Sequence, residues 1–223
     1  MVQNASLTDS AYAEVKALIL QGAIAPHAQI DEKAIAGRLG MSRTPVREAL
    51  LRLEHEGLVE IERGRGIVVR ALSSGDMREI YQAITGMEVM AVYLLAASRP
   101  GRDTLEPLFA ALQRMEQATV HADLELWGEA DEAFHRGLLV LCGNSRIERT
   151  GLQFRDLSRR AHLVAMRLQA LDYLARSTEA HRELTELILA GDPDQAATAH
   201  FRQRRRGEDM LVTAVEKFRL VAL

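Results

Sequence analysis

Apolar positions in the first part of the chain follow a helical spacing in three short segments, and two strand-like runs come after them. Thr8, Asp31 and Ser42 precede the three segments, and these residue types favour the N-cap position. The segment Arg63-Gly64-Arg65-Gly66 separates the two strand-like runs and is typical of a hairpin turn. The pattern therefore predicts a winged helix-turn-helix. The expected helices cover residues 8–21, 32–39 and 43–56, and the expected strands cover residues 58–62 and 67–70.

From residue 74 onward, the apolar positions keep a helical spacing almost to the end of the chain. Pro100-Gly101, Gly143-Asn144 and Gly191-Asp192-Pro193 interrupt it, and such residues commonly end helices. Short connections favour antiparallel neighbours, so we expect an antiparallel bundle of about six helices. These helices are expected at residues 75–98, 102–121, 124–142, 145–168, 172–190 and 193–218. The predicted fold class is mainly α, with one domain at residues 1–73 and a second at residues 74–223.

The composition is that of an ordinary globular protein, with 48% hydrophobic and 26% charged residues in a chain of 223. A chain of this length can bury a core without disulfides, and its single cysteine, Cys142, cannot form an internal one. The lack of a disulfide framework fits a reducing compartment. The longest dense apolar run, residues 90–97, is much shorter than the roughly 18 residues that would span a bilayer. We therefore expect a cytoplasmic protein that does not enter a membrane.

Positive charge is concentrated in one segment, although the chain carries a net charge of -3. Residues 1–73 hold nine Lys/Arg and nine Asp/Glu, but the segment from Lys33 to Arg47 holds four basic residues and no acidic one. Arg43 and Arg47 are four residues apart at the start of the third expected helix, so they share a face. Arginines on such a face can read guanine in the major groove of double-stranded DNA. The segment indicates either a DNA-recognition helix or a solvated basic helix face.

Polar groups near this helix suit the phosphate backbone of DNA. Ser42 and Thr44 lie at the helix start, where hydroxyl groups and unpaired backbone N–H groups can bind phosphate oxygens. In the hairpin turn, Arg63 and Arg65 flank Gly64 and can reach phosphates or a minor groove.

These segments resemble the DNA-binding domain of GntR-type bacterial regulators. The match runs from Leu39 to Val59, through the recognition helix, and continues from Arg63 to Val69 in the wing. The resemblance implies a homodimer that binds a short inverted repeat in double-stranded DNA, which doubles the basic surface of one copy. It also implies DNA contacts from the second helix, the recognition helix and the wing tip, through Lys33, Ser42, Arg43, Thr44, Arg47, Arg63 and Gly64.

The rest of the chain resembles the FadR branch of that family and its all-helical ligand-binding domain, called FCD. The match covers nearly all of residues 75–215. The resemblance implies a helical domain that dimerises and binds a small-molecule effector, expected to be an organic acid. We therefore expect a transcriptional regulator, acting as a repressor, whose operator affinity changes with that effector. The residues that carry the resemblance are the run 131–135, Gly143-Asn144, His181 and the run 187–192.

A possible metal site involves Asp131 and His135, which are four residues apart on one expected helix and can therefore hold one ion between them. Together with His181 from another helix, they form a ligand set suited to Zn, Ni, Mn or Fe(II). The FCD resemblance places a further histidine at Gln203, and His200 stands one helical turn earlier. A fourth ligand from His200 or Gln203 therefore stays open. The alternative for Asp131 and His135 is an ordinary helix-face hydrogen bond.

The sequence also allows predictions for other positions of the second domain. The arginine that holds an organic acid in many FCD domains corresponds here to Ile84, four residues before Glu88. His162 has no partner pattern, so a surface or packing position is expected. His200, if it binds no metal, is expected to be partly buried or at the surface. The basic run at residues 202–206 predicts a solvated helix face.

The alternative function is a metal-dependent enzyme built on Asp131, His135 and His181 in a helical bundle. Against it, the sequence has no general base beside these residues, no nucleophile motif and no Gly-rich phosphate loop. A regulator instead places its two recognition helices in successive major grooves. Effector binding then repacks the bundle and acts on DNA through the linker at residues 72–75. We therefore expect no enzymatic activity.

Overall fold

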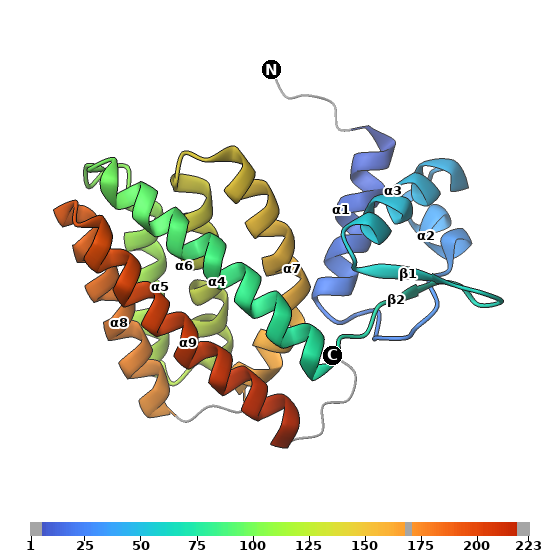
Figure 1. Ribbon diagram of the computed structural model, residues 1–223. Helices are drawn as coiled ribbons and strands as arrows, with labels where there is room; N and C mark the ends of the chain where they lie inside the picture. Colours follow the sequence, from blue (N-terminus) through green and yellow to red (C-terminus); the bar gives the residue numbers. More distant parts are fainter. Residues whose placement is uncertain (1–5, 168–170, 218–223) are drawn as a thin grey trace. The chain divides into compact units, whose positions relative to one another are not determined.

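The computed structural model describes residues 6–167 and 171–217 of the chain (Figure 1). The chain divides into two compact units between Ser73 and Ser74. Within the described residues, the first unit holds three helices and a two-stranded antiparallel sheet, and the second holds helices only. The predicted fold class, mainly α with a wing after the helix-turn-helix, is confirmed.

The elements of the first unit follow the predicted order, and their ends differ from the predicted ones by one residue at most. They are α1 (Leu7–Leu20), α2 (Glu32–Leu39), α3 (Arg43–His55), β1 (Val59–Glu62) and β2 (Gly66–Val69). Strong local signals explain this agreement. Gly40 and Gly57 follow α2 and α3 with φ angles of 64° and 79°, a left-handed conformation that glycine adopts without strain.

N-terminal caps determine where α1 and α2 begin. The prediction that Thr8 caps α1 is wrong, because Ser6 occupies that position. The Ser6 hydroxyl accepts a hydrogen bond from the backbone N–H of Asp9, and the Asp9 carboxylate accepts one from the backbone N–H of Ser6, which completes a capping box. Asp31 caps α2 as predicted, since its carboxylate accepts hydrogen bonds from two backbone N–H groups of the first turn.

The start of α3 differs from these two caps. Ser42 stands at the N-cap position, but its side chain makes no capping hydrogen bond. Pro45 lies in the first turn, where the N–H group that proline lacks would have no partner in the helix. The remaining N–H groups of this turn receive no hydrogen bond acceptor from the cap, so they are available to an anion.

The wing is a short hairpin that a third segment covers on one edge. β1 and β2 pair antiparallel with Val59 opposite Val69. Gly64, at the turn, has a φ angle of 84°, a conformation that side chains beyond glycine rarely adopt. Gln29 forms an isolated bridge with Val68, so the segment before α2 lies along β2. The hairpin is thereby held against the helices of this unit.

An apolar core fixes the orientation of α3. Val15 and Ile19 of α1 are fully buried, as are Leu50 and Leu53 of α3, and the two helices pack against each other. Because Leu50 and Leu53 face this core, the opposite face of α3 is exposed. The burial of this face, rather than helix propensity, determines which side chains of α3 meet the solvent.

Within the described residues, the second unit consists of six helices with short connections. They are α4 (Ser74–Ala97), α5 (Glu106–His121), α6 (Leu124–Leu141), α7 (Ser145–Arg167), α8 (Leu171–Ala190) and α9 (Pro193–Lys217). The predicted start of α5 at residue 102 is wrong. Tight turns occupy the residues before Glu106, with the Leu105 N–H donating to the Arg102 carbonyl over 3.0 Å. The predicted helix ends at residues 168 and 218 lie outside the described residues.

Helix α4 is central to the packing of the second unit. It packs against α6, α7, α8 and α9, and Figure 1 shows α4 and α9 running side by side. Helix α5 packs against α6 and α8. The main apolar cluster of this unit includes Leu95, Leu108, Trp127, Phe134, Leu138, Leu184 and Ile188. It holds the helices together on one side of a group of buried polar side chains.

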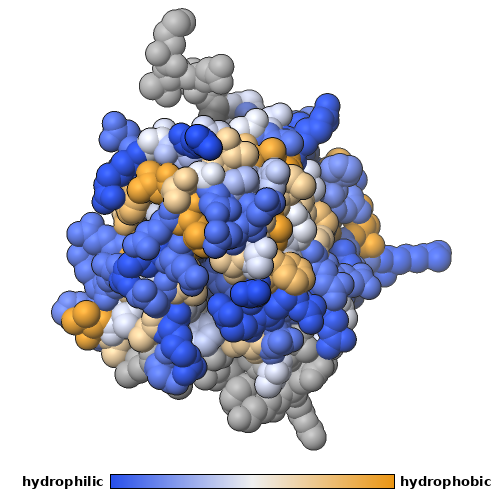
Figure 2. Space-filling model, turned by 60° about the vertical axis from the view of Figure 1, so that its left-hand side comes forward, coloured by the Kyte–Doolittle hydropathy of each residue, from blue (hydrophilic) through white to orange (hydrophobic). Residues whose placement is uncertain are grey.

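Helix α4 is long and apolar enough to cross a membrane by length and composition alone. The prediction from the sequence considered only the dense apolar run at residues 90–97, which is too short to span a bilayer. Half of its most apolar window is buried inside the protein, and Glu88 in its middle is fully buried. On the face drawn in Figure 2, hydrophobic residues form small groups among hydrophilic ones. Helix α4 therefore has the character of a core helix and does not indicate a membrane protein.

Adjacent leucines of α3 test the packing of the first unit. Leu50 is fully buried and Leu51 is 47% exposed. Leu50→Ala should lower the free energy of unfolding of this unit by about 2–5 kcal/mol, because it leaves a cavity. Leu51→Ala should change it by at most about 0.5 kcal/mol.

Urea unfolding measures this effect with two probes. Circular dichroism reports on both units, whereas the fluorescence of Trp127, the only tryptophan, reports on the second unit. Leu50→Ala should shift the dichroism transition and leave the fluorescence midpoint in place. An equal loss of stability in the Leu51→Ala variant would contradict this account of the core.

Candidate functional site

The first turns of α3 form an exposed polar surface. The side chains of Ser42, Arg43, Thr44 and Arg47 are all exposed, and Arg43 retains 69% of its side-chain accessibility. Arg43 lies 3.8 Å from Glu32 of α2, measured from Nη2 to Oε2. Exposed ion pairs contribute little free energy, so Arg43 can exchange this partner for a phosphate or a base. Among the described residues, no ion pair joins Arg47.

A shallow depression lies on this surface. It has a volume of about 450 Å³ and is lined by Glu32, Arg43, Thr44, Arg47, Glu48 and Leu51. Lys33 is exposed on the neighbouring helix α2. The structure therefore brings together the predicted residues of α3, and places Lys33 on the helix that precedes it in the helix-turn-helix.

The two arginines of the wing differ in their contacts. Arg63 and Gly64 are exposed at the tip of the hairpin. Arg65 donates hydrogen bonds to the Glu62 carboxylate over 2.6 Å and to the His27 carbonyl over 2.8 Å. Arg65 therefore joins the wing to the segment before α2, and the prediction that it serves DNA in the same way as Arg63 receives no support from these contacts.

A group of ionisable side chains is buried between the helices of the second unit. Its members come from α4, α6, α7, α8 and α9, and each is at most 7% exposed. They are Glu88, Asp131, Glu132, His135, Arg155, His162, His181, His200 and Arg204. We call this set the polar core. Burying charges costs several kcal/mol per ion unless they are paired, so the contacts within the set determine which groups carry charge.

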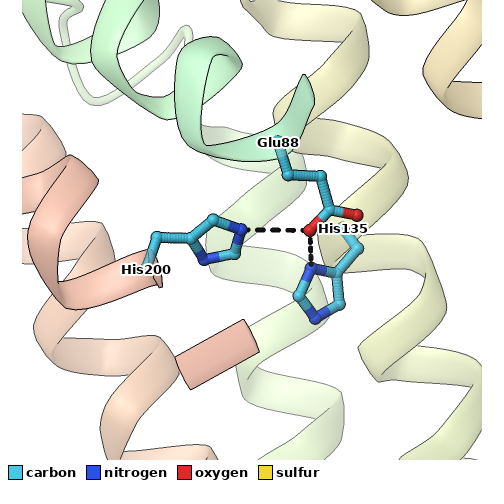
Figure 3. A group of neighbouring side chains, drawn as sticks. All are labelled: Glu88, His135 and His200. Atoms are coloured by element: carbon cyan, nitrogen blue, oxygen red, sulfur yellow. Dashed lines mark hydrogen bonds and ion pairs between the residues drawn. The ribbon is translucent and has the colours of Figure 1, made fainter. Parts of the chain in front are cut away.

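Glu88 is at the centre of one half of the polar core (Figure 3). Its Oε2 lies 2.9 Å from His135 Nδ1 and 3.0 Å from His200 Nε2, and its Oε1 accepts a hydrogen bond from Arg155 over 3.1 Å. Arg204 Nε lies 3.5 Å from Oε2. Burial alone would raise the pKa of Glu88, but the cations around it, Arg204 above all, hold that pKa well below its ordinary value. The carboxylate is therefore charged.

Asp131 is at the centre of the other half. Its Oδ1 lies 3.2 Å from His181 Nε2 and 3.6 Å from His135 Nε2. One ligand atom from each of these three residues lies within 4.8 Å of the other two, and all three residues are buried. Burial opposes the charge of Asp131, but His135 and the other imidazoles keep its pKa well below the ordinary value. The predicted set of Asp131, His135 and His181 is therefore brought together around one point.

His135 connects the two halves, because Nδ1 faces Glu88 and Nε2 faces Asp131. Burial alone would lower the pKa of His135, but the two carboxylates outweigh it and raise the pKa above its ordinary value. With Nδ1–H held by Glu88, the Nε2 lone pair is the one that would meet a metal. A histidine that binds a metal through one ring nitrogen commonly donates a hydrogen bond from the other ring nitrogen to a carboxylate.

His181 and Gln203 are in direct contact. His181 Nδ1 donates to the Ser177 carbonyl over 2.7 Å, which leaves the Nε2 lone pair toward Asp131. The Gln203 side-chain amide nitrogen lies 3.0 Å from His181 Nε2. Gln203 Oε1 lies 3.2 Å from His200 Nδ1. Position 203 is therefore next to the predicted metal set, but it presents an amide there rather than an imidazole.

The other two histidines of the polar core are both buried. His200 is fully buried rather than near the surface, and its ligand atom belongs to a second set, with Glu88 and His135. Burial lowers the pKa of His200 to about 4, so the ring is neutral and its Nε2–H donates to Glu88. His162 is also buried, with Nε2 3.0 Å from Asp131 Oδ2. The prediction that His200 is partly buried or at the surface is therefore wrong, whereas His162 takes the packing position that was one of its two expected positions.

The sequence did not identify Arg155 and Arg204 as members of the polar core. Arg204, within the run predicted to be a solvated face, is 3% exposed and lies over the Tyr81 ring at 4.3 Å. Arg155 of α7 contacts Glu88 and also Glu132, and its pKa is raised by these carboxylates despite burial. Ile84, at the position of the family's anion-binding arginine, is a fully buried apolar residue. Positive charge in this core therefore comes from α7 and α9 rather than from α4.

The spacing of the polar residues in α7 could have identified its buried polar face from the sequence. Arg155, Ser158 and His162 are spaced by three and four positions, so they lie on one helix face, and all three are buried. A polar stripe on one face normally indicates a solvated surface, and only contact with neighbouring helices shows that this one is buried.

Comparisons with known families agree with the fold of both units. Residues 7–69 match the family described as "Bacterial regulatory proteins, gntR family", and residues 79–203 match the FCD domain. An HTH-type transcriptional regulator from the TAR-I ttuE-ttuC' intergenic region of Agrobacterium vitis is 37% identical over 148 residues, which cover 62% of this chain and 82% of that protein. The HTH-type transcriptional repressor GlaR of Escherichia coli is 27% identical and covers 83% of this chain and 87% of its own.

Solved structures share the fold over most of the chain's length. A GntR transcriptional regulator from Rhodococcus sp. RHA1 has a TM-score of 0.74 at 25% identity, covering 92% of this chain and 96% of its own. E. coli McbR/YncC has a TM-score of 0.79 at 22% identity, covering 96% and 99%, which shows the fold.

The matched families and relatives are transcription regulators, and the alternative of a metal-dependent enzyme is not supported by them. The first unit carries the GntR helix-turn-helix that binds DNA, and the second carries the FCD domain, which binds a small-molecule effector. The chain therefore belongs to the GntR family of bacterial transcriptional regulators, in the group whose DNA-binding domain is followed by an FCD domain.

Proposed function

We propose that this regulator acts in the bacterial cytoplasm as a repressor of transcription. It binds, as a homodimer, to a short inverted repeat in double-stranded DNA. In this proposal residues 1–73 bind the operator and residues 74–223 bind the effector and the second copy. The observation that carries it is the start of α3, where exposed arginines lie beside backbone N–H groups that have no side-chain cap. Such a surface combines base recognition with phosphate binding.

The proposed DNA contacts divide into two kinds. Arg43 and Arg47, four residues apart on the exposed face of α3, read base edges in the major groove. The hydroxyl groups of Ser42 and Thr44, with the N–H groups of the helix start, bind phosphate oxygens. The remaining contacts come from α2 and from the wing tip, through Lys33, Arg63 and Gly64.

A groove between α4 and α9 is the proposed surface for the second copy. It has a volume of about 360 Å³ and is lined by Gln82, Thr85, Gly86, Val89, Phe201, Arg205 and Glu208. Phe201 is 50% exposed, so an apolar side chain is offered at the groove edge. Arg205 pairs with the nearly buried Glu208 of the same helix over 3.4 Å, so a two-fold axis can pack the apolar part of this groove against that of a second copy. The groove can therefore meet the same surface of a second copy without bringing an unpaired charge from these two residues.

The effector is proposed to be an organic acid that changes operator affinity by repacking the helices of the second unit. Coupling of this kind is typically worth about 1–3 kcal/mol, or roughly 5- to 150-fold in affinity. Arg155 and Arg204 supply positive charge in the polar core, and both keep buried N–H groups without a hydrogen bond acceptor among the described residues. A panel of carboxylic acids that left operator affinity unchanged would contradict this part of the proposal.

We also propose that Asp131, His135 and His181 hold a divalent transition metal, of the Zn, Ni, Mn or Fe class. The residues fit such an ion, because their ligand atoms converge in a buried space and Asp131 Oδ2 has no hydrogen-bond partner among the described residues. A bound metal would supply a Lewis-acidic position for the carboxylate of the effector. Glu88 holds the imidazole of His135 in the orientation that this requires.

Replacing either recognition arginine should weaken operator binding. Arg43→Ala and Arg47→Ala should each cost about 1–3 kcal/mol of binding free energy, because a bidentate base contact is lost. The operator comes from selection of genomic fragments with the purified protein, and fluorescence anisotropy then measures affinity. Arg52→Ala is the matched control, since Arg52 lies in the last turn of the same helix and pairs with Asp9. Equal losses in all three variants would argue against recognition through this face.

The proposed dimer surface predicts a change in mass. Phe201→Glu should convert the protein from dimer to monomer at micromolar concentration, because it places a charge in the apolar part of the interface. Sedimentation velocity measures the mass. Val120→Glu, which changes an 80% exposed residue of α5 outside the groove, should leave the dimer intact. A Phe201→Glu protein that remains dimeric would place the interface elsewhere.

Metal binding is measured on the full chain after chelation and dialysis. Wild-type protein should bind one Ni²⁺ or Zn²⁺ per chain with a rise in the midpoint of thermal unfolding, since an ion that binds only the folded state stabilises it. His181→Ala should abolish most of this rise. His121→Ala, which changes an exposed histidine of α5, is the control. Wild-type protein that retains no metal above the control level would remove the proposed site.

A further inference from the structure

We infer that His162 of α7 is a fourth protein ligand of the metal site, in place of the imidazole that this chain lacks at position 203. The inference rests on the proposed metal binding by Asp131, His135 and His181 and adds a ligand to it. It also makes α7 part of the site, together with α6 and α8.

Two buried polar atoms are in close contact at this position without a well-aligned hydrogen bond. Asp131 Oδ2 and His162 Nε2 are 3.0 Å apart, and both are almost fully inaccessible to solvent. They are not aligned for a hydrogen bond, so neither has a hydrogen-bond partner among the described residues. Their contact has the distance of an ion pair, and a buried polar atom that lacks a hydrogen bond costs about 1–3 kcal/mol, so both atoms retain the capacity for a further ligand. A cation that accepts lone pairs from both atoms removes this cost.

The chemistry of the donors matches a transition metal. The ligand atoms of Asp131, His135 and His181 lie within 4.8 Å of one another, and His162 stands outside that set and contacts it through Asp131 Oδ2. With His162 drawn in, the site offers one carboxylate and three imidazoles, a set of nitrogen and oxygen ligands that Zn²⁺ and Ni²⁺ bind well. Asp131 is the common member, because Oδ1 faces His181 and His135 while Oδ2 faces His162. His162 therefore approaches Asp131 from the side that the other two imidazoles leave open.

The other candidates for a fourth ligand are less suitable. Gln203, which contacts His181, offers an amide group, and an amide oxygen suits Zn²⁺ or Ni²⁺ less well than an imidazole does. His200 is held by Glu88 rather than by Asp131, with Nε2 and Oε2 3.0 Å apart. Arg155 and Arg204 also approach that carboxylate, and two guanidinium charges oppose a divalent cation there. The set around Glu88 is therefore a poor metal site, whereas the set around Asp131 has no arginine within ion-pair distance among the described residues.

A ligand on α7 has a structural consequence. The buried face of this helix carries polar residues, including Arg155 and His162, which meet the polar core. A metal bound through His162 fixes α7 to α6 and α8. Metal occupancy is thus expected to stabilise the position of α7, the helix that supplies Arg155 to the polar core.

The test measures Ni²⁺ affinity by isothermal titration calorimetry and the coordination of Co²⁺ by its visible absorption, on metal-free full-length protein. His162→Ala should weaken Ni²⁺ binding by at least about tenfold and change the Co²⁺ spectrum, because one nitrogen ligand is lost. Gln203→Ala should bind within about threefold of the wild type, which is less than 1 kcal/mol. His121→Ala serves as the control for a histidine outside the site.

A rescue variant separates ligation from folding. The His162→Ala/Gln203→His double variant places an imidazole at the position beside His181, and it should recover Ni²⁺ affinity toward the wild-type value. Recovery cannot follow from a folding defect caused by His162→Ala. Thermal unfolding of each metal-free variant verifies that all are folded.

The outcomes are distinct. Wild-type affinity and an unchanged Co²⁺ spectrum in His162→Ala, with metal loss in His181→Ala, would overturn the inference and leave the proposed three-residue site standing. No metal binding by the wild type would remove both the site and the inference, while operator binding remains a separate measurement. Weakened binding in His162→Ala with recovery in the double variant supports the inference.

Discussion

The second unit depends on neutralising a charged carboxylate, that of Glu88, in the middle of its central helix. Arg155, Arg204 and His135 come from three other helices to meet it. Removing one partner of a buried ion pair typically costs about 3–5 kcal/mol, because the remaining charge is left unpaired. The relative positions of α4, α6, α7 and α9 are therefore linked to the geometry of this one group, and a ligand that alters its charge balance acts on all four helices.

The two units differ in where their charged residues lie. In the first unit, apolar residues such as Leu50 and Leu53 form the core, and the charged residues of α3 remain outside, where they can exchange partners with DNA. In the second unit, charged residues form part of the core itself, so their interactions are strong and their partners are fixed. A rigid apolar core suits a surface that must present side chains in one orientation. A buried polar network suits a site whose stability changes when an ion or an acid enters it.

Where this chain lacks a residue of the FCD pattern, a residue from another helix brings a similar group to the same core. Ile84 replaces a cation on α4, and Arg155 and Arg204 bring positive charge to Glu88 from α7 and α9. Gln203 replaces an imidazole on α9, and His162 brings one from α7 to Asp131. Compensation between helices is possible because a buried site requires only that the right atoms reach it, from whichever neighbouring helix carries them.

The sequence by itself determined the elements and their order, because helix periodicity, caps and turn glycines are local signals. It also determined the exposed face of α3 and the pairing of Asp131 with His135, since residues four apart share a helix face. Only the tertiary structure decided that Glu88 meets His135, Arg155 and His200, which lie 47, 67 and 112 residues further along the chain. A polar stripe such as that of α7 has the same periodicity whether it faces water or a neighbouring helix. The packing of the bundle therefore had to show that Arg155, His162 and Arg204 are buried.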